Sequence, residues 1–166
     1  MSAPFRVLFV CLGNICRSPT GECLLRAAVV DQGLEELVEI DSAGTGAWHI
    51  GESPDRRMSA AAAQRGYSLR GSSRQVTAGE LPDWSMVVAM DRQNLADLQD
   101  LAGGHEVSLR LFSEFLPPGA NPDVPDPYYS GGFDRAIELI EEGCVNLLEE
   151  LVEEEEGNGS QPQPAD

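Results

Sequence analysis

The sequence contains no lysine, and its basic residues are 11 arginines against 28 acidic residues. The resulting net charge is -17 at pH 7. Nucleic acids and anionic membranes attract proteins mainly through clusters of positive charge. This charge balance therefore argues against either one as a main partner of the protein, and we expect neither nucleic-acid binding nor membrane binding.

Long apolar runs are also lacking, and no stretch approaches the roughly 20 residues that a membrane span needs. The apolar stretch near the N-terminus is interrupted by Gly13, Asn14 and Arg17. No small-residue cleavage site follows it, so it does not have the form of a signal peptide. We therefore expect the protein to be cytoplasmic.

Cysteine and histidine are scarce, with four cysteines (Cys11, Cys16, Cys23, Cys144) and two histidines (His49, His105). Their spacing matches no zinc finger or zinc ribbon, so we predict no metal site. In a reducing compartment the four thiols stay free. Cys23 and Cys144 fall within helical patterns, and we expect both to be buried as small apolar residues.

Short apolar runs alternate with helical patterns along the chain. Strands are predicted at 7–10, 38–41, 86–90 and 109–112, and helices at about 19–32, 54–65, 92–102 and 134–152. This alternation is typical of βαβ units in an α/β fold, with helices on both faces of a parallel sheet. The 166 residues suffice for one domain, which we place at 1–152, followed by an acidic, disordered tail at 153–166.

The most informative segment lies between the first predicted strand and the first helix, Cys11-Leu12-Gly13-Asn14-Ile15-Cys16-Arg17-Ser18-Pro19. A loop in this position directs several backbone N–H groups to one point, where a phosphate fits. A thiol beneath that point, beside an arginine, is readily ionised and becomes a nucleophile. Arg17 can hold two phosphate oxygens in a bidentate fork. Ser18 is a suitable N-cap for the helix, and its hydroxyl is placed to hydrogen-bond the sulfur of Cys11.

Cleavage of a phosphate ester of a phenol requires a proton for the leaving oxygen. Neither histidine lies in a suitable place to supply it. Asp126 is the best candidate, because Pro125 and Pro127 stiffen the loop in which it lies, after the last predicted strand. An acid in such a turn is more often a plain surface residue, and it is the cysteine loop that favours a catalytic role.

Five segments together resemble the low-molecular-weight protein tyrosine phosphatase family. They are the cysteine loop, Asp41-Ser42-Ala43-Gly44-Thr45, Arg74-Gln75, Met90-Asp91 with Asn94, and Asp126-Pro127-Tyr128-Tyr129, and they occur in the family's order. The resemblance covers about residues 5–152. It implies a three-layer α/β/α, Rossmann-like fold with a four-stranded parallel sheet, and a phosphatase that uses no metal or other cofactor. By position, Cys11 is then the nucleophile that forms a cysteinyl phosphate, Arg17 the phosphate clamp and Asp126 the general acid.

The resemblance also implies the residues that bind the substrate, which are Leu12, Gly13, Asn14, Ile15, Cys16, Ser18, Trp48, Tyr128 and Tyr129. Asn14 is implied to fix the backbone of the loop through hydrogen bonds that include Ser18 and Ser42. Leu12, Ile15, Trp48 and the two tyrosines are implied to form apolar walls, which suit a phenyl ring better than a short serine side chain. For Trp48, a semi-buried aromatic without a role in binding is the alternative.

The implied function is hydrolysis of phosphotyrosine in proteins by a monomer, with inorganic phosphate as the product. Cys16 also invites a redox interpretation. Members of the family can form a reversible disulfide between the nucleophile and this neighbouring cysteine, which would protect Cys11 and switch activity off. The alternative is that Cys16 only fills a small space behind the loop.

Two features depart from the family pattern. Gly71 stands where many members carry a histidine that supports the loop asparagine, and the turn Ser130-Gly131-Gly132 is shorter, which reshapes the rim of the cleft. Three alternative functions remain. Arsenate reductases relay oxidation through two further cysteines, a relay that the positions of Cys23 and Cys144 do not suggest. Protein arginine phosphatases carry a threonine where Ile15 stands, and an inactive phosphate-binding module would not need Asp126.

Overall fold

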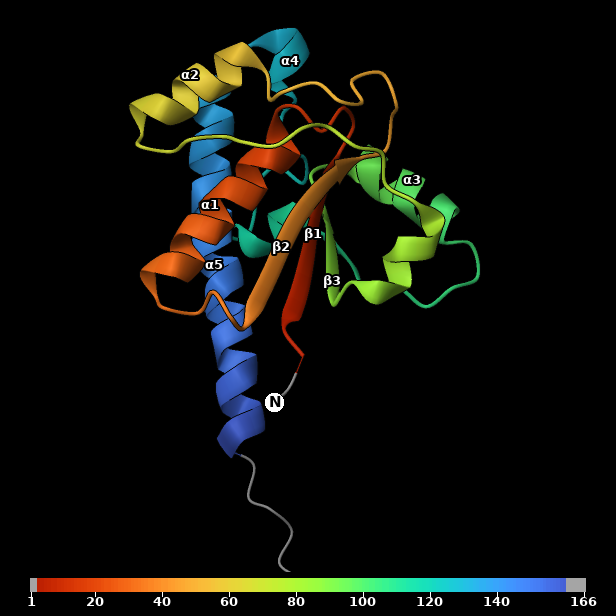
Figure 1. Ribbon diagram of the computed structural model, residues 1–166, viewed down its shortest axis with the longest axis vertical. Coiled ribbons are helices and arrows are strands. Elements are labelled where there is room, and N and C mark those ends of the chain that lie inside the picture. The colour runs from red at the N-terminus through yellow and green to blue at the C-terminus, as the bar shows by residue number, and fades with distance from the viewer. Residues whose placement is uncertain (1–2, 161–166) are drawn as a thin grey trace, which may run out of the picture.

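The computed structural model describes residues 3–160 (Figure 1). The strands β1 (Phe5–Cys11), β2 (Val38–Gly44), β3 (Met86–Ala89) and β4 (Leu109–Leu111) form one sheet in the order β2-β1-β3-β4. All three strand pairs are parallel. The helices are α1 (Arg17–Asp31), α2 (Arg56–Gln64), α3 (Arg92–Ala102), α4 (Pro127–Ser130) and α5 (Phe133–Ser160), with 3-10 turns η1 (Ala78–Asp83) and η2 (Phe112–Phe115). The predicted α/β class with a four-stranded parallel sheet is confirmed.

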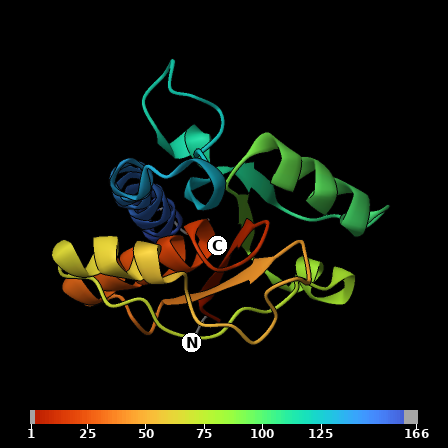
Figure 2. The same ribbon diagram turned by 90° about the horizontal axis from the view of Figure 1, so that it is seen from above.

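The sheet has a hydrophobic layer on each face because β1 is buried on both. Val7 and Phe9 pack with residues of α1, α2 and α5. Leu8 and Val10 pack on the other face with residues of η1 and α3. Figures 1 and 2 show α1 and α5 on one side of the sheet and α3 on the other. The unbroken apolar run of β1 is the sequence pattern that a strand covered on both faces requires.

The order of the strands creates a crevice at one edge of the sheet. From β1 the chain passes through α1 to β2 on one side, whereas β3 pairs with the other side of β1. In parallel sheets, ligands bind beyond the carboxyl ends of the strands where the order reverses in this way. Cys11 is the last residue of β1, so the fold places it at this edge.

The four predicted strands are all present, and the predicted helix at 92–102 has the bounds of α3. The 3-10 turns and the short helix α4 were not predicted. The prediction that Ser18 caps the first helix is wrong. Helix α1 begins at Arg17 with Cys16 as its N-cap and no side-chain cap bond, because the hydroxyl of Ser18 is bonded instead to groups around the cysteine loop.

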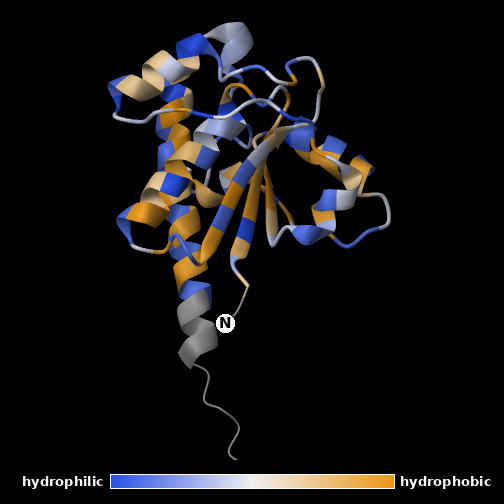
Figure 3. Ribbon diagram, viewed as in Figure 1, coloured by the Kyte–Doolittle hydropathy of each residue, from blue (hydrophilic) through white to orange (hydrophobic). Residues whose placement is uncertain are grey.

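The last helix is longer than its apolar pattern indicates. Helix α5 continues to Ser160, into the segment expected to be a disordered tail, whereas the apolar stripe ends near residue 152. Four consecutive glutamates follow that stripe. Glutamate has a high intrinsic helix propensity, so a helix can continue through such a run without an apolar stripe. The rest of the expected tail, 161–166, lies outside the described residues. Figure 3 shows hydrophobic residues recurring along α5 between hydrophilic ones, and Ile137, Ile140 and Leu147 among them are fully buried.

A glycine allows α5 to pack closely against η2. A Cβ atom added at Gly143 would lie 2.3 Å from two ring carbons of Phe112. Phe112 is fully buried, and its ring lies 6.4 Å from the ring of Phe9 and 6.4 Å from that of Phe115. Because neighbours surround the ring, it has no room to move away from an added methyl group.

We predict that Gly143→Ala destabilises the protein although alanine is the better helix former. Overpacking a dense core costs about 1–3 kcal/mol, whereas alanine gains at most about 1 kcal/mol of helix propensity. Urea unfolding should therefore give a lower free energy of unfolding. Glu142→Ala, at the exposed neighbouring position, is the control and should stay within about 0.5 kcal/mol of the parent. Equal or higher stability of Gly143→Ala would contradict the close packing.

Candidate active site

A cavity of about 310 Å³ opens at the carboxyl edge of the sheet. It is lined by Cys11, Leu12, Gly13, Ile15, Cys16, Arg17, Trp48, His49, Asp126, Tyr128 and Tyr129. These residues come from the loop after β1, the connection from β2 to α2, and α4 with the residue before it. The cavity thus gathers the three predicted catalytic residues, although about 110 positions separate Arg17 from Asp126 in the chain.

The loop between β1 and α1 bends through a single left-handed residue, Asn14, with φ of 57°. Asparagine is one of the few residues other than glycine that adopt this conformation readily. The loop is held against the end of β2, where the N–H groups of Thr45 and Gly46 donate to the carbonyls of Cys11 and Leu12 at 2.9 Å each. Gly44 permits this approach, because a Cβ there would lie 2.8 Å from the carbonyl oxygen of Leu12.

The bend turns hydrogen-bond donors toward the sulfur of Cys11. The backbone N–H groups of Asn14 and Ser18 lie 3.3 and 3.4 Å from Sγ, and the hydroxyl oxygen of Ser18 lies 3.0 Å from it. The side chain of Cys11 is buried, yet it borders the cavity. Two backbone N–H groups and one hydroxyl therefore converge on a sulfur at the base of the cavity.

Asn14 and Ser18, which the resemblance implies among the substrate-binding residues, are not among the residues that line the cavity. Both residues are buried, Asn14 within the loop and Ser18 in the first turn of α1. The side-chain amide of Asn14 donates to the hydroxyl oxygens of Ser18 at 2.8 Å and Ser42 at 3.0 Å. It accepts from the backbone N–H of Arg74 at 2.9 Å. These bonds hold the loop from behind, although Gly71 offers no side chain for the purpose.

The guanidinium of Arg17 is almost completely buried and is fixed by three partners. Its Nη1 donates to Asp91 at 2.6 Å and to the carbonyl of Val124 at 3.0 Å, and its Nη2 lies 3.4 Å from Asp126. Burial alone would lower the pKa of Arg17, but the charges of Cys11, Asp91 and Asp126 outweigh it and raise that pKa. The side chain is therefore a permanent cation at the cavity.

Asp91 is a residue to which the sequence assigned no role. It is the N-cap of α3, where one carboxylate oxygen accepts from the N–H of Asn94 at 2.7 Å and the other accepts from Arg17. An aspartate directly before a helical pattern is a recognisable N-cap signal. Its second bond, to an arginine on another element, could not be read from the sequence.

Asp126 lies at the start of α4 and caps it. One carboxylate oxygen accepts from the N–H of Tyr128 at 3.1 Å, and Pro127 occupies the first helical position. Proline suits that position because its missing N–H would have no partner within the helix. The cap holds the carboxyl group at the cavity, with its other oxygen directed toward Arg17.

Aromatic side chains form the outer walls of the cavity. Tyr128 and Tyr129 stack edge-on with ring centroids 5.0 Å apart. Trp48 and Tyr129 are 75% and 77% exposed, so a ligand would cover surface that now faces solvent. His49, which the sequence did not indicate, also lines the cavity, paired with Glu52 and edge-on to Tyr128 at 5.6 Å. The one sequence signal that could have indicated a role for His49 is its position next to Trp48.

The cysteines differ in their surroundings. Cys16 is buried and borders the cavity, and burial is the main cause that raises the pKa of its thiol. Cys144 is buried as predicted, whereas Cys23 is half-buried, which corrects the prediction for it. The thiol of Cys23 donates to the carbonyl of Ser68 at 3.5 Å, in the connection between α2 and η1, and this contact is exposed.

Two further observations concern the described residues, 3–160. No helix among them is both long and apolar enough to cross a membrane. Nowhere in this part of the chain do three or more histidine, cysteine, aspartate or glutamate side chains gather in a way that could hold a metal ion.

Fold and cavity define an α/β protein in which a thiol, a guanidinium and a carboxyl group meet at the loop after β1. Residues 6–157 match the family model of the low molecular weight phosphotyrosine protein phosphatases. The chain belongs to this family. A low molecular weight protein-tyrosine-phosphatase of Streptomyces coelicolor is 43% identical to it over 162 residues, which cover 94% of this chain and 99% of the relative.

Solved structures agree with this assignment. The crystal structure of YfkJ from Bacillus subtilis has a TM-score of 0.88 and 38% identity, over 92% of this chain and 98% of that one. The crystal structure of a Drosophila arginine phosphatase is also similar, with a TM-score of 0.82 and 31% identity, over 87% of this chain and 96% of that one. The fold alone therefore does not distinguish between a phosphotyrosine and a phosphoarginine substrate.

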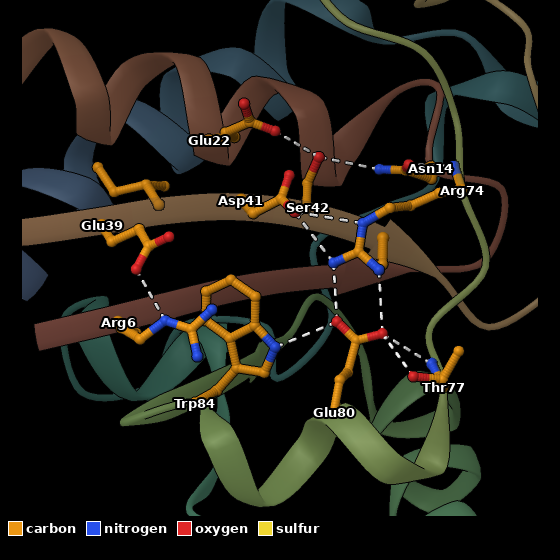
Figure 4. A network of polar contacts seen from close by, with 12 residues as sticks. Arg6, Asn14, Glu22, Glu39, Asp41, Ser42, Arg74, Thr77, Glu80 and Trp84 are labelled. Atoms are coloured by element: carbon orange, nitrogen blue, oxygen red, sulfur yellow. Dashed lines mark hydrogen bonds and ion pairs between the residues drawn. The ribbon is translucent and has the colours of Figure 1, made fainter.

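An ion network supports the outer side of the loop (Figure 4). The guanidinium of Arg74, whose backbone N–H holds Asn14, donates to Asp41 at 3.0 Å and to Glu80 at 2.8 Å. Burial alone would raise the pKa of Glu80. Hydrogen bonds from Arg74, Thr77 and Trp84 outweigh burial and lower that pKa to about 2.

We predict that Glu80→Gln weakens the fold at pH 7 and flattens its acid denaturation. The pKa of Glu80 in the folded state lies below its ordinary value of 4.5. Its contribution to stability is therefore present above about pH 4.5 and is lost as the pH falls toward about 2. When thermal unfolding is measured across this pH range, the melting temperature of the variant should fall less steeply with decreasing pH than that of the parent. Glu39→Gln, which alters the exposed ion pair with Arg6, is the control. Parallel profiles for parent and Glu80→Gln would contradict the assignment.

Proposed function

We propose that the protein hydrolyses phosphotyrosine in proteins, as a monomer in the cytoplasm, through a cysteinyl-phosphate intermediate. The observation that supports this best is the position of the Cys11 sulfur, which accepts hydrogen bonds from loop N–H groups in a cavity that Arg17 and Asp126 also line. The membership of the chain in the low molecular weight phosphotyrosine protein phosphatase family supports phosphotyrosine as the substrate class. The four free thiols would stay reduced in the cytoplasm.

In the first step the thiolate of Cys11 attacks phosphorus in line with the tyrosyl oxygen. The sulfur–phosphorus bond forms as the phosphorus–oxygen bond breaks, and Asp126 donates a proton to the departing phenolate. Loop N–H groups and the guanidinium of Arg17 stabilise the equatorial oxygens, whose charge develops in the transition state. The ion pair of Arg17 with Asp91 holds the guanidinium at the cavity before the substrate binds.

In the second step a water molecule attacks phosphorus and the sulfur leaves. Asp126, now a carboxylate, takes a proton from the water, and inorganic phosphate is released. The hydroxyl of Ser18, 3.0 Å from the sulfur, donates a hydrogen bond to the departing thiolate. The protein therefore returns to its starting protonation state after each turnover.

The walls of the cavity favour an aromatic substrate. Trp48, Tyr128 and Tyr129 can pack on a phenyl ring, which buries apolar surface worth about 25 cal/mol per Å². Phosphoarginine is the alternative substrate, because a Drosophila arginine phosphatase has a similar structure. Ile15 in the loop favours phosphotyrosine, because protein arginine phosphatases carry a threonine at this position and Ile15 has no hydroxyl that could contact a phosphoramidate substrate.

We predict that initial rates will be much higher on phosphotyrosine peptides than on matched phosphoarginine or phosphoserine peptides. Cys11→Ser should show no turnover, because serine is not ionised at neutral pH. Asp126→Ala should be slower by about 10²–10⁴ on substrates with poor leaving groups, since the phenolate then leaves unprotonated.

The leaving group supplies the control for this experiment. An aryl phosphate with a strongly acidic phenol needs little protonation, so Asp126→Ala should lose much less rate on it. Equal losses on both substrates would exclude Asp126 as the general acid. A preference for phosphoarginine would exclude the tyrosine assignment, and turnover by Cys11→Ser would exclude Cys11 as the nucleophile.

We further infer that Cys16 protects Cys11 from irreversible oxidation. Peroxide would oxidise the thiolate of Cys11 to a sulfenic acid, and the thiol of Cys16 would then displace water from that sulfur to form a disulfide. Both residues border the same cavity. Burial keeps Cys16 protonated, so peroxide should attack Cys11 first.

We predict that peroxide inactivates the protein and that a dithiol then restores its activity. In Cys16→Ser the recovered fraction should be much lower, because the sulfenic acid proceeds to the sulfinic acid. Cys23→Ser, which removes a half-buried thiol outside the cavity, is the matched control and should recover like the parent. If Cys16→Ser also recovers like the parent, the protective disulfide is excluded.

A further inference from the structure

A continuous chain of hydrogen bonds leads from Glu22 on α1 to the sulfur of Cys11. The carboxylate of Glu22 accepts from the hydroxyl of Ser42 at 2.7 Å, and Ser42 accepts from the amide of Asn14 at 3.0 Å (Figure 4). The same amide donates to Ser18, whose oxygen lies 3.0 Å from Sγ. Glu22 itself does not line the cavity that contains Cys11.

The direction of each bond in this chain is determined by chemistry. A carboxylate only accepts, so the single proton of the Ser42 hydroxyl is committed to Glu22. The lone pairs of Ser42 are then available to the NH₂ group of Asn14. Because the backbone N–H of Arg74 already donates to the other end of that amide, Asn14 has only one possible orientation. Ser18 receives the second amide proton and keeps its own proton for the sulfur or the carbonyl of Ala43.

Helix geometry places the two ends of the chain together. Ser18 and Glu22 are four residues apart on α1, so their side chains lie on the same face of the helix. Ser42 comes from β2, and Asn14 is the left-handed residue of the loop. The chain thus connects helix, strand and loop around a backbone conformation that a non-glycine residue adopts only at some cost.

We propose that Glu22 is a positioning residue for the phosphate-binding loop, which acts through Ser42 and Asn14 on the donors that face Cys11. This inference rests on the proposed function. Its rival is an ordinary surface ion pair, because Glu22 also accepts from Arg26 at 2.8 Å. The guanidinium of Arg26 is about half exposed, and an exposed pair at this helical spacing contributes little to stability. Such a pair would give Glu22 no influence on Cys11.

The two roles are separated by comparing Glu22→Ala with Glu22→Gln. Glutamine keeps an oxygen that can accept from Ser42 but removes the charge. We expect Glu22→Ala to lower kcat on a phosphotyrosine peptide about tenfold, the effect of one lost hydrogen bond. Glu22→Gln should stay within about twofold of the parent. Glu39→Ala removes a carboxylate from β2 far from the loop and should leave kcat unchanged.

Alkylation of Cys11 by iodoacetate, followed against pH, provides a readout that a merely structural role would not change. Glu22→Ala should move the midpoint of the alkylation rate to higher pH, because the donors around the sulfur are less well fixed. Ser42→Ala should have the same effect, and the double variant should be no worse than either single variant, since both changes break one chain. Circular dichroism at the assay temperature confirms that each variant is folded.

Three outcomes would overturn the inference. Glu22→Ala with the kcat and alkylation profile of the parent would show that the chain has no influence on the sulfur. If Glu22→Gln lowers kcat as much as Glu22→Ala, the effect comes from the charge of Glu22 and not from its hydrogen bond to Ser42. Additive losses in the double variant would show that the two residues act separately. Because alkylation needs no substrate, it tests Glu22 even if the parent fails to hydrolyse phosphotyrosine, which would overturn the proposed function alone.

Discussion

The left-handed backbone of Asn14 is the constraint on which the site depends. This one bend turns loop N–H groups toward Cys11, and every polar atom of the Asn14 side-chain amide is used to hold it. The partners come from α1, β2 and the segment before η1, so elements on several sides of the loop share the task. The donors of the loop are therefore already in place in the protein without a ligand, and donors fixed in this way need no reorganisation when a charge is placed before them.

The cation of the site is positioned by a second, independent set of contacts. Arg17 is buried at the start of α1, and its guanidinium is oriented by Asp91 at the start of α3 and by the carbonyl of Val124. Two carboxylates therefore approach one guanidinium, of which Asp126 is the more distant. The closer pair, with Asp91, fixes the cation, and the longer contact brings the carboxyl group of Asp126 to the same side of the cavity.

Much of this architecture could be predicted from the sequence, because the strands are short apolar runs and the helices between them have clear apolar faces. The position of Cys11 at a strand end followed from the same pattern, whereas the first helix was expected at about residue 19 and begins at Arg17. Asp126 was a candidate from its proline-flanked turn and the cysteine loop, and the resemblance to a family added the role of general acid. Contacts between distant elements could not be predicted. The bond of Asp91 to Arg17 and the place of His49 at the cavity both depend on how the chain packs, which local patterns do not encode.

The outer walls of the cavity are exposed, whereas the residues at its base are buried. Trp48, between β2 and α2, and Tyr129, on the short helix α4, are largely exposed, and neither belongs to either hydrophobic layer of the sheet. Substitutions there change the shape offered to a ligand while the layers that maintain the fold stay intact. Preference for one phosphoprotein over another can consequently diverge by single replacements at the rim, and an inhibitor that reaches beyond the phosphate toward these two rings would distinguish this protein from relatives with other residues there.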